Sequence, residues 1–290
     1  MATGAGQPPR AAAASASQPM ATGARQLPSS AAFPALAWAP RNTRAMTPVK
    51  LREMWTTQSG RSSVIGFYGH TGDRTGYECF SNFFDQTECP FDFVIPREMF
   101  AFPVEEQDRA VKCTFSEKSI MLYKAAVMGD RDSYKRIAEA TTPVAAKKLG
   151  RSVRGFDDEL WSRIVCTVAL DVVYQKFSNT SSIREVLLGT GQKLLAEATH
   201  NDRNWGIGID LGDERVQTPA SWQGTNILGW ALMEVRDALR SGTADGAAAD
   251  GAPGKAVVPE ERAGLLSPRR LEGREEGHHT LRIEEDLVCL

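Results

Sequence analysis

Glu117 and Lys124 are the two side chains whose types and spacing most directly suggest chemistry. They lie within the stretch Thr114 to Asp130, whose apolar residues recur at helical spacing. Because seven residues make about two helical turns, the carboxylate and the amine would project from nearly the same face. Such a pair suits acid–base or amine chemistry. The structural alternative is a capping box, in which Glu117 pairs with a Thr114 N-cap and Lys124 is solvated.

Aromatic residues surround Asn82 in the stretch Tyr77–Phe84. Phe83 is a candidate for stacking on a base or a ribose, and Asn82 for a hydrogen bond to a sugar or ring edge. The alternative for these aromatic rings is packing in the core.

A second polar stretch, His200 to Gly208, has the composition of a turn and carries Asp202, Trp205 and Gly206. A tryptophan held in a turn has little local reason to be buried, which favours a functional role. Asp202 is either part of a site or the side chain that closes an Asx turn.

A local basic patch follows Pro143, which predicts the first turn of a helix. Lys147, Lys148, Arg151 and Arg154 fall within eight residues of a nearly neutral chain. Arginine and lysine at this density suit a phosphate, and the alternative is a solvated helix face.

The helices and strands expected from the hydrophobic pattern position these residues. They indicate an α+β fold, a single compact and mostly helical domain with a small β-sheet. Asn226 is the expected N-cap of the last helix, whose first N–H groups could also receive an anion. We expect helices over 114–130, 131–140, 143–150, 157–177, 181–188 and 227–239, and strands over 64–68, 91–95, 109–113 and 194–199.

Length and composition limit the class of protein. The 290 residues carry a formal net charge of −2, which marks neither a nucleic-acid binder nor a membrane binder. The five cysteines form no CxxC pair, which indicates reduced thiols in an intracellular, most simply cytoplasmic, protein. No apolar run reaches the ~20 residues of a membrane span. Glycine-rich nucleotide loops and zinc-ligand spacings are absent, so we expect no cofactor and no metal.

Both ends of the chain have biased composition. Residues 1–60 are expected to be a disordered extension, rich in Ala, Pro, Ser and Gly at its start. The alternative is an organelle-targeting segment, because the first 50 residues contain basic side chains and no acid. Residues 242–290 are expected to be a second disordered tail, which leaves 61–241 as the folded domain.

Five sequence blocks in order resemble the NADAR superfamily, also called the YbiA-like N-glycosidases. No single block is specific, but together they cover most of residues 64–239. The resemblance implies the compact α+β fold of that family. The blocks are FSNF at Phe80–Phe83, SEKSIMLYK at Ser116–Lys124, PVAAKKLGR at Pro143–Arg151, EATHNDRNWGIG at Glu197–Gly208 and WQGTNILGWALMEVR at Trp222–Arg236.

The resemblance implies that Glu117, Lys124 and Asp202 are catalytic. It also implies that Asn82 and Arg151 belong to the site. The other expected site residues follow from the residue types described above. The expected binding residues are Asn82, Phe83, Lys147, Arg151, Trp205, Gly206 and Asn226.

The activity that the resemblance implies is hydrolysis of the N-glycosidic bond of a phosphorylated riboside. Substrates in the family include early intermediates of riboflavin synthesis and ADP-ribose attached to guanine, so ADP-ribosylated DNA or RNA is an expected partner. The alternative is a non-catalytic module that binds ADP-ribose or a related nucleotide. Lys118, Ser119 and Tyr123 replace the family's usual residues, and we expect these changes to alter the pocket wall and hence the substrate.

Overall fold

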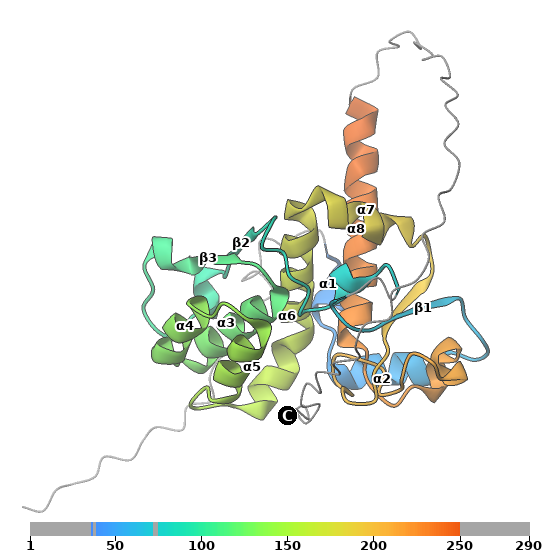
Figure 1. The fold of residues 1–290 in the computed structure, drawn as a ribbon, viewed down its shortest axis with the longest axis horizontal. Coiled ribbons are helices and arrows are strands. Elements are labelled where there is room, and N and C mark those ends of the chain that lie inside the picture. Colours follow the sequence, from blue (N-terminus) through green and yellow to red (C-terminus); the bar gives the residue numbers. More distant parts are fainter. Residues whose placement is uncertain (1–35, 37–38, 72–74, 250–290) are drawn as a thin grey trace, which may run out of the picture.

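The computed structural model describes residues 36, 39–71 and 75–249, with the backbone alone for 243–249. One long helix, α6 (Asp158–Asn179), lies between two groups of elements (Figure 1). The first group contains α3 (Ser116–Met128), α4 (Arg131–Ala138) and α5 (Pro143–Arg151), and the second contains α2 (Pro48–Thr56), α7 (Ser181–Gly189) and α8 (Ile227–Ala249). Shorter segments are α1 (Arg41–Arg44) and the 3₁₀ helices Glu78–Phe80, Arg97–Met99, Glu106–Arg109, Glu214–Gln217 and Pro219–Ser221.

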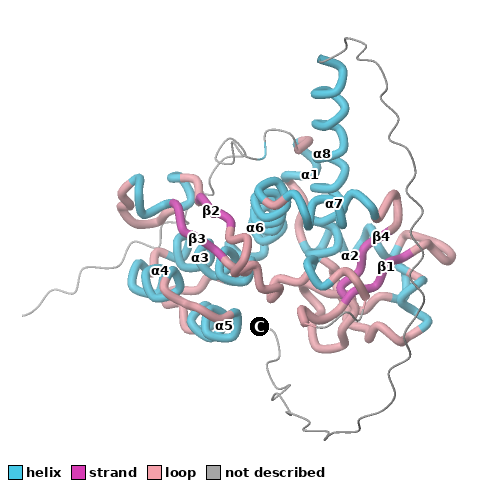
Figure 2. The backbone as a smooth tube through the Cα atoms, turned by 45° about the horizontal axis from the view of Figure 1, so that its top comes forward, coloured by secondary structure: helices cyan, strands magenta, loops and turns pink. Residues whose placement is uncertain are grey.

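Two small sheets lie on opposite sides of α6 (Figure 2). β1 (Val64–Phe67) pairs in parallel with β4 (Leu194–Glu197), and this sheet packs against α8. β2 (Phe91–Val94) pairs antiparallel with β3 (Ala110–Cys113), and both lie where the sequence predicted strands. The predicted class, a mostly helical α+β domain, is confirmed, although two sheets stand where one was expected.

Helix α3 begins and ends for different reasons. It ends at Gly129, whose φ of 80° is the left-handed conformation that favours glycine, as the sequence predicted. At its start the N-cap residue is Phe115, which makes no side-chain capping bond, so the predicted Thr114 cap is wrong. The backbone N–H of Glu117 instead donates to the carbonyl of Asn82 at 2.9 Å. A neighbouring loop therefore satisfies the helix start and ties the FSNF block to α3.

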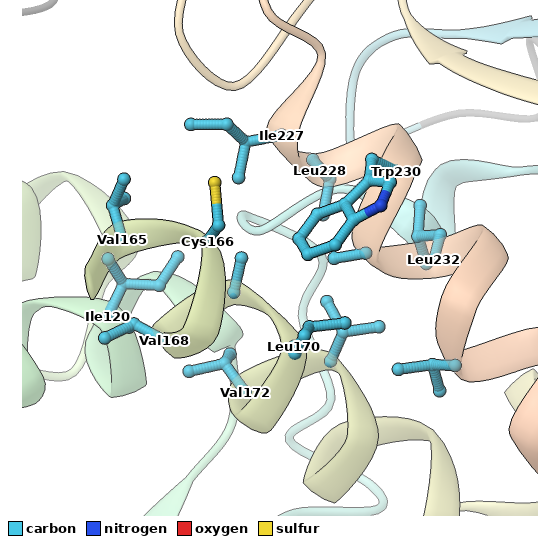
Figure 3. Packing of buried hydrophobic residues seen from close by; sticks show 14 of the residues in the cluster. Ile120, Val165, Cys166, Val168, Leu170, Val172, Ile227, Leu228, Trp230 and Leu232 are labelled. Atoms are coloured by element: carbon cyan, nitrogen blue, oxygen red, sulfur yellow. The ribbon is translucent and has the colours of Figure 1, made fainter. Parts of the chain in front are cut away.

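The core is built around the middle of α6. Residues 164–173 of this helix are all buried, as expected for a helix covered on every side. Figure 3 shows Cys166 and Leu170 of α6 close to Trp230 of α8, and all three belong to the same buried cluster. This packing fixes α6 and α8 relative to each other, which matters because the site lies where both helices begin.

Residues 39–60 belong to the fold, so the prediction of a disordered or targeting extension over 1–60 is wrong for this part. Trp55 is 2% exposed and packs against Trp222 in a tilted arrangement, with ring centroids 4.9 Å apart. Its indole N–H donates to the carbonyl of Thr225 at 2.8 Å, and Arg52 donates to the carbonyl of Gly224 at 3.1 Å. The sequence around Trp55 does not indicate this packing, because the residues that Trp55 and Arg52 contact lie far along the chain. Residues 1–35 and 37–38 are outside the described residues.

The last helix is longer than predicted. α8 continues to Ala249, past the expected end at Leu239. The rest of the predicted tail, 250–290, lies outside the described residues. Within the described ranges, no helix has both the length and the apolar character needed to cross a bilayer.

Candidate active site

A cavity of about 280 Å³ lies where the two groups of elements meet, beside the first half of α6. This is close to the lower limit of small-molecule sites, which have volumes of roughly 300–1,000 Å³. Residues from α2, α3, α5, α6, α8, β4 and three loops line it. Of the predicted site residues, the structure brings eight together here: Asn82, Phe83, Glu117, Lys124, Lys147, Arg151, Asp202 and Trp205.

The apolar part of the cavity wall comes from three helices. Ile120 of α3, Val165 of α6 and Ile227 of α8 line the cavity and belong to the packing in Figure 3. Because these side chains are part of the core, the wall is rigid. The polar groups around it are therefore held in a fixed, poorly hydrated environment.

Glu117 is placed in the first turn of α3 and is only 6% exposed. Burial is the main cause of a rise in the pKa of its carboxyl group from 4.5 to about 7; Lys147 opposes this rise and the nearby Asp202 carboxylate contributes to it. Since the side chain lines the cavity and the N-cap makes no side-chain bond, the capping-box alternative does not hold.

Lys124 lies two turns further along the same face and is 8% exposed. Its Nζ lies 4.0 Å from the ring centroid of Phe156, which covers the amine. Burial lowers the pKa of Lys124, the cation of Arg151 lowers it further, and the carboxylate of Asp158 acts in the opposite direction. The alternative of a solvated lysine is therefore wrong.

The cations of the cavity come from α5. Lys147 and Arg151 lie four residues apart and so share one helix face, and both line the cavity. The Nζ of Lys147 is 5.3 Å from the ring centroid of Phe83. The start of α8 was the other expected anion site, but the N–H groups of Ile227 and Leu228 donate to loop carbonyls.

Asp202 has a structural role as well as a place in the cavity. Its Oδ1 accepts hydrogen bonds from the N–H groups of Asn204 at 2.9 Å and Trp205 at 2.8 Å, which is the Asx turn that the sequence allowed. This turn presents the half-buried Trp205 to the cavity.

Gly206 and Asn226 do not line the cavity, contrary to their prediction as binding residues. A Cβ on Gly206 would lie 2.7 Å from the carbonyl oxygen of Glu197, so this position needs glycine for close packing. Asn226 is fully buried with φ 53°, donates to the carbonyl of Leu195 at 2.8 Å and accepts from the N–H of Glu197 at 3.2 Å. Both residues hold the end of β4 in place.

Glu197, Phe156, Asp158 and Trp161 also line the cavity, although they were not among the predicted site residues. Burial and the neighbouring Asp202 raise the pKa of Glu197 from 4.5 to about 8. The sequence signal for Glu197 was its position as the first residue of the EATHNDRNWGIG block. An acidic residue at the end of a strand does not by itself indicate a buried side chain. In the part of the chain that the structure describes, no cluster of three His, Cys, Asp or Glu side chains is suited to hold a metal ion.

The departures from the family pattern in α3 do not reach the cavity. Lys118, Ser119 and Tyr123 are buried on other faces of the helix. Lys118 donates to the carbonyl of Ala138 at 3.3 Å, and the hydroxyl of Tyr123 donates to Asp171. The expectation that these changes alter the pocket wall is therefore wrong, because the cavity takes only the positions at helical spacing from Glu117.

Comparison with known proteins places the chain in a family. The family model for the NADAR domain matches residues 66–240, and this chain belongs to that family. The matched range contains the eight predicted residues that line the cavity. It leaves out α1 and α2, which the structure shows packed against the domain.

Three relatives illustrate the similarity. The chain is 35% identical over 163 residues to Protein irg-1 of Caenorhabditis elegans, covering 55% of this chain and 74% of that protein. It is 31% identical over 174 residues to N-glycosidase R617 of Acanthamoeba polyphaga mimivirus, covering 60% and 94%. N-glycosidase YbiA of Escherichia coli is 27% identical over 117 residues, covering 40% and 66%. The solution structure of E. coli YbiA is similar at 24% identity with a TM-score of 0.47, covering 65% of this chain and 91% of that one.

Proposed function

We propose that this chain is a hydrolase that cleaves the N-glycosidic bond of a phosphorylated riboside. The observation that carries the proposal is a single cavity in which a buried carboxyl group, Glu117, and a buried amine, Lys124, lie beside the two cations of α5. The names of R617 and YbiA, both N-glycosidases, support the same reaction class.

The reaction requires a group that stabilises positive charge on the sugar. Breaking a glycosidic bond develops oxocarbenium character at C1, and a carboxylate beside C1 stabilises it and orients a water. Glu117 is suited to this role because its pKa of about 7 leaves a substantial fraction ionised at neutral pH. In the direct route the water oxygen bonds to C1 while Glu117 accepts its proton.

Lys124 offers a second route to the same products. Its neutral amine attacks C1, and the C1–N bond of the substrate breaks with its electron pair on the leaving nitrogen. The resulting glycosylamine breaks its C1–O4 ring bond to give a Schiff base, which water hydrolyses to regenerate the amine. A nucleophilic lysine needs a lowered pKa, and burial under Phe156 together with the cation of Arg151 lowers that of Lys124.

The rest of the cavity gives the orientation of the substrate. Lys147 and Arg151 would receive the phosphate, and Phe83 and Trp205 would lie against the sugar or the base. The substrate would be an intermediate of riboflavin synthesis or an ADP-ribosylated guanine. With ADP-ribosylated DNA or RNA, a cavity of about 280 Å³ would admit the ribosyl group and leave the polynucleotide outside.

A panel of phosphorylated N-ribosides and ADP-ribosylated guanine substrates, analysed for free base, tests the proposal. We expect base release that falls at least ~10²-fold in Glu117→Gln, the usual effect of removing such a group. Glu185→Gln, at an exposed position of α7, is the matched control and should retain activity. If the wild-type chain binds ADP-ribose tightly and releases base from no substrate, it is instead a non-catalytic binding module.

A further inference from the structure

The leaving group of an N-glycosidase poses a separate chemical problem. When the C1–N bond breaks, the electron pair stays on nitrogen, and a positioned acid that supplies a proton there accelerates the reaction by typically 10²–10⁴-fold. The acid must hold its proton at neutral pH and must have an oxygen free to face the ligand. Four carboxyl groups line the cavity, those of Glu117, Asp158, Glu197 and Asp202, and the charge of Asp158 acts on Lys124.

Asp202 is poorly suited to be this acid. Its Oδ1 accepts from two backbone N–H groups at 2.9 and 2.8 Å, and these bonds form the turn that carries Trp205. A carboxyl oxygen that accepts two N–H groups in a turn is committed to that turn. Glu117 is already required as the carboxylate that stabilises C1.

Glu197 has the opposite surroundings. Its Oε2 is closed to solvent, and among the described residues no donor or acceptor bonds to it. A buried polar oxygen without a partner is unusual in a native structure and requires an explanation. The Glu197 side chain as a whole is half-buried and lines the cavity, so a turn of its carboxyl group would bring this oxygen to a ligand that supplies the missing partner.

The backbone around Glu197 is fixed on both sides. The N–H of Glu197 donates to the side-chain oxygen of Asn226 at 3.2 Å, and the carbonyl of Glu197 accepts from the N–H of Ile207 at 2.8 Å. Asn226 holds this position at φ 53°, a left-handed conformation that is uncommon for a residue other than glycine. Strained residues of this kind persist where the surrounding structure holds them firmly, often near functional sites.

We propose that Glu197 is the catalytic acid that protonates the leaving nitrogen, an assignment that rests on the proposed N-glycosidase function. In this step the C1–N bond breaks, the nitrogen takes the electron pair and the proton of Glu197, and water or Lys124 bonds to C1. Glu197 is left as a carboxylate and regains its proton from solvent before the next turnover.

The charges that face Glu197 support this protonation state. Asp202 and Glu117 disfavour a negative charge there, while Lys147 of α5 favours it. Burial is the largest of these effects and also disfavours the charge, so the pKa of Glu197 is raised above its ordinary value. The proposal assigns the proton to Glu197 and the negative charge to Glu117, the division of roles that glycoside hydrolysis requires.

The test compares two leaving groups in the wild-type protein and in Glu197→Gln. One substrate is an N-riboside 5-phosphate, whose base needs a proton to leave, and the other is 4-nitrophenyl riboside 5-phosphate, whose phenolate leaves without one. We expect the variant to lose at least ~10²-fold in kcat/KM on the N-riboside and to stay within a few-fold of wild type on the nitrophenyl substrate. Glu185→Gln serves as the control for folding and charge.

Four results would overturn the assignment. Equal losses on both substrates would mean that Glu197 acts on binding or folding, and a leaving-group-dependent loss in Asp202→Asn alone would make Asp202 the acid. If Glu197→Gln does not fold, the wild-type pH profile decides. A fall in kcat/KM on the basic side for the N-riboside but not for the nitrophenyl substrate supports the assignment, and equal falls refute it. A wild-type protein that cleaves neither substrate refutes the proposed function itself, and Glu197 with it.

Discussion

Replacing Glu117 with glutamine should stabilise the protein while removing its activity. The pKa of this carboxyl group is about 7 in the folded chain against an ordinary value of 4.5. Because the folded state binds the proton more tightly, the stability contributed by this group is present at low pH and is lost as pH rises from 4.5 to 7. At about 1.4 kcal/mol for each pH unit, the buried charge costs about 3 kcal/mol above pH 7. Glutamine has nearly the same shape and carries no charge.

Thermal unfolding at two pH values measures this effect. At pH 8 the variant should melt about 6–12 °C above wild type, since 1 kcal/mol corresponds to about 2–4 °C in a domain of this size. At pH 4.5 or below, where wild-type Glu117 is protonated, the two should melt within a degree or two of each other. The exposed Glu185→Gln variant should show neither effect. A Glu117→Gln variant that is less stable at pH 8, or equally shifted at both pH values, would refute the buried charge.

Further predictions concern Lys124 and the N-terminal helix. If Lys124 forms a Schiff base, borohydride added during turnover should attach the sugar to its side chain, and mass spectrometry should detect the adduct. Lys124→Arg should abolish this adduct. An active Lys124→Arg protein without an adduct would leave only the direct-water route. Trp55→Ala should cost about 3–5 kcal/mol of unfolding free energy in urea, whereas Val49→Ala, at a 65% exposed position of the same helix, should stay within about 0.5 kcal/mol; equal effects would contradict the packing of α2. A chain shortened to begin at residue 61 should unfold at lower temperature than the full chain, because it lacks Trp55 and Arg52; an unchanged melting temperature would contradict this.

Local signals in the sequence predicted most of the helical framework. The left-handed glycine at 129 ends α3, and Pro143 occupies the first turn of α5, because both effects depend on one residue's own backbone. The seven-residue offset of Glu117 and Lys124 also needed only helical geometry. The prediction that they share a face holds, and both line one cavity.

The features that the sequence did not reveal depend on distant contacts. Trp55 looks like part of a low-complexity extension until Trp222 is placed against it. Asn226 looks like a helix cap, but its amide is used by β4 instead. Glu197 is an ordinary acid in the sequence, and only the burial and charges that the fold assembles around it raise its pKa. Such effects arise from tertiary structure and have no local pattern.

Proton NMR spectra recorded during turnover of an N-riboside 5-phosphate test the central claim most directly. The account predicts that the anomeric proton signal of the riboside decays while signals of free base and ribose 5-phosphate grow in equal amounts. This conversion should disappear in Glu117→Gln and persist in Glu185→Gln. A substrate that binds to the wild-type protein with its anomeric signal unchanged in amount, or that breaks at a bond other than C1–N, would contradict the account.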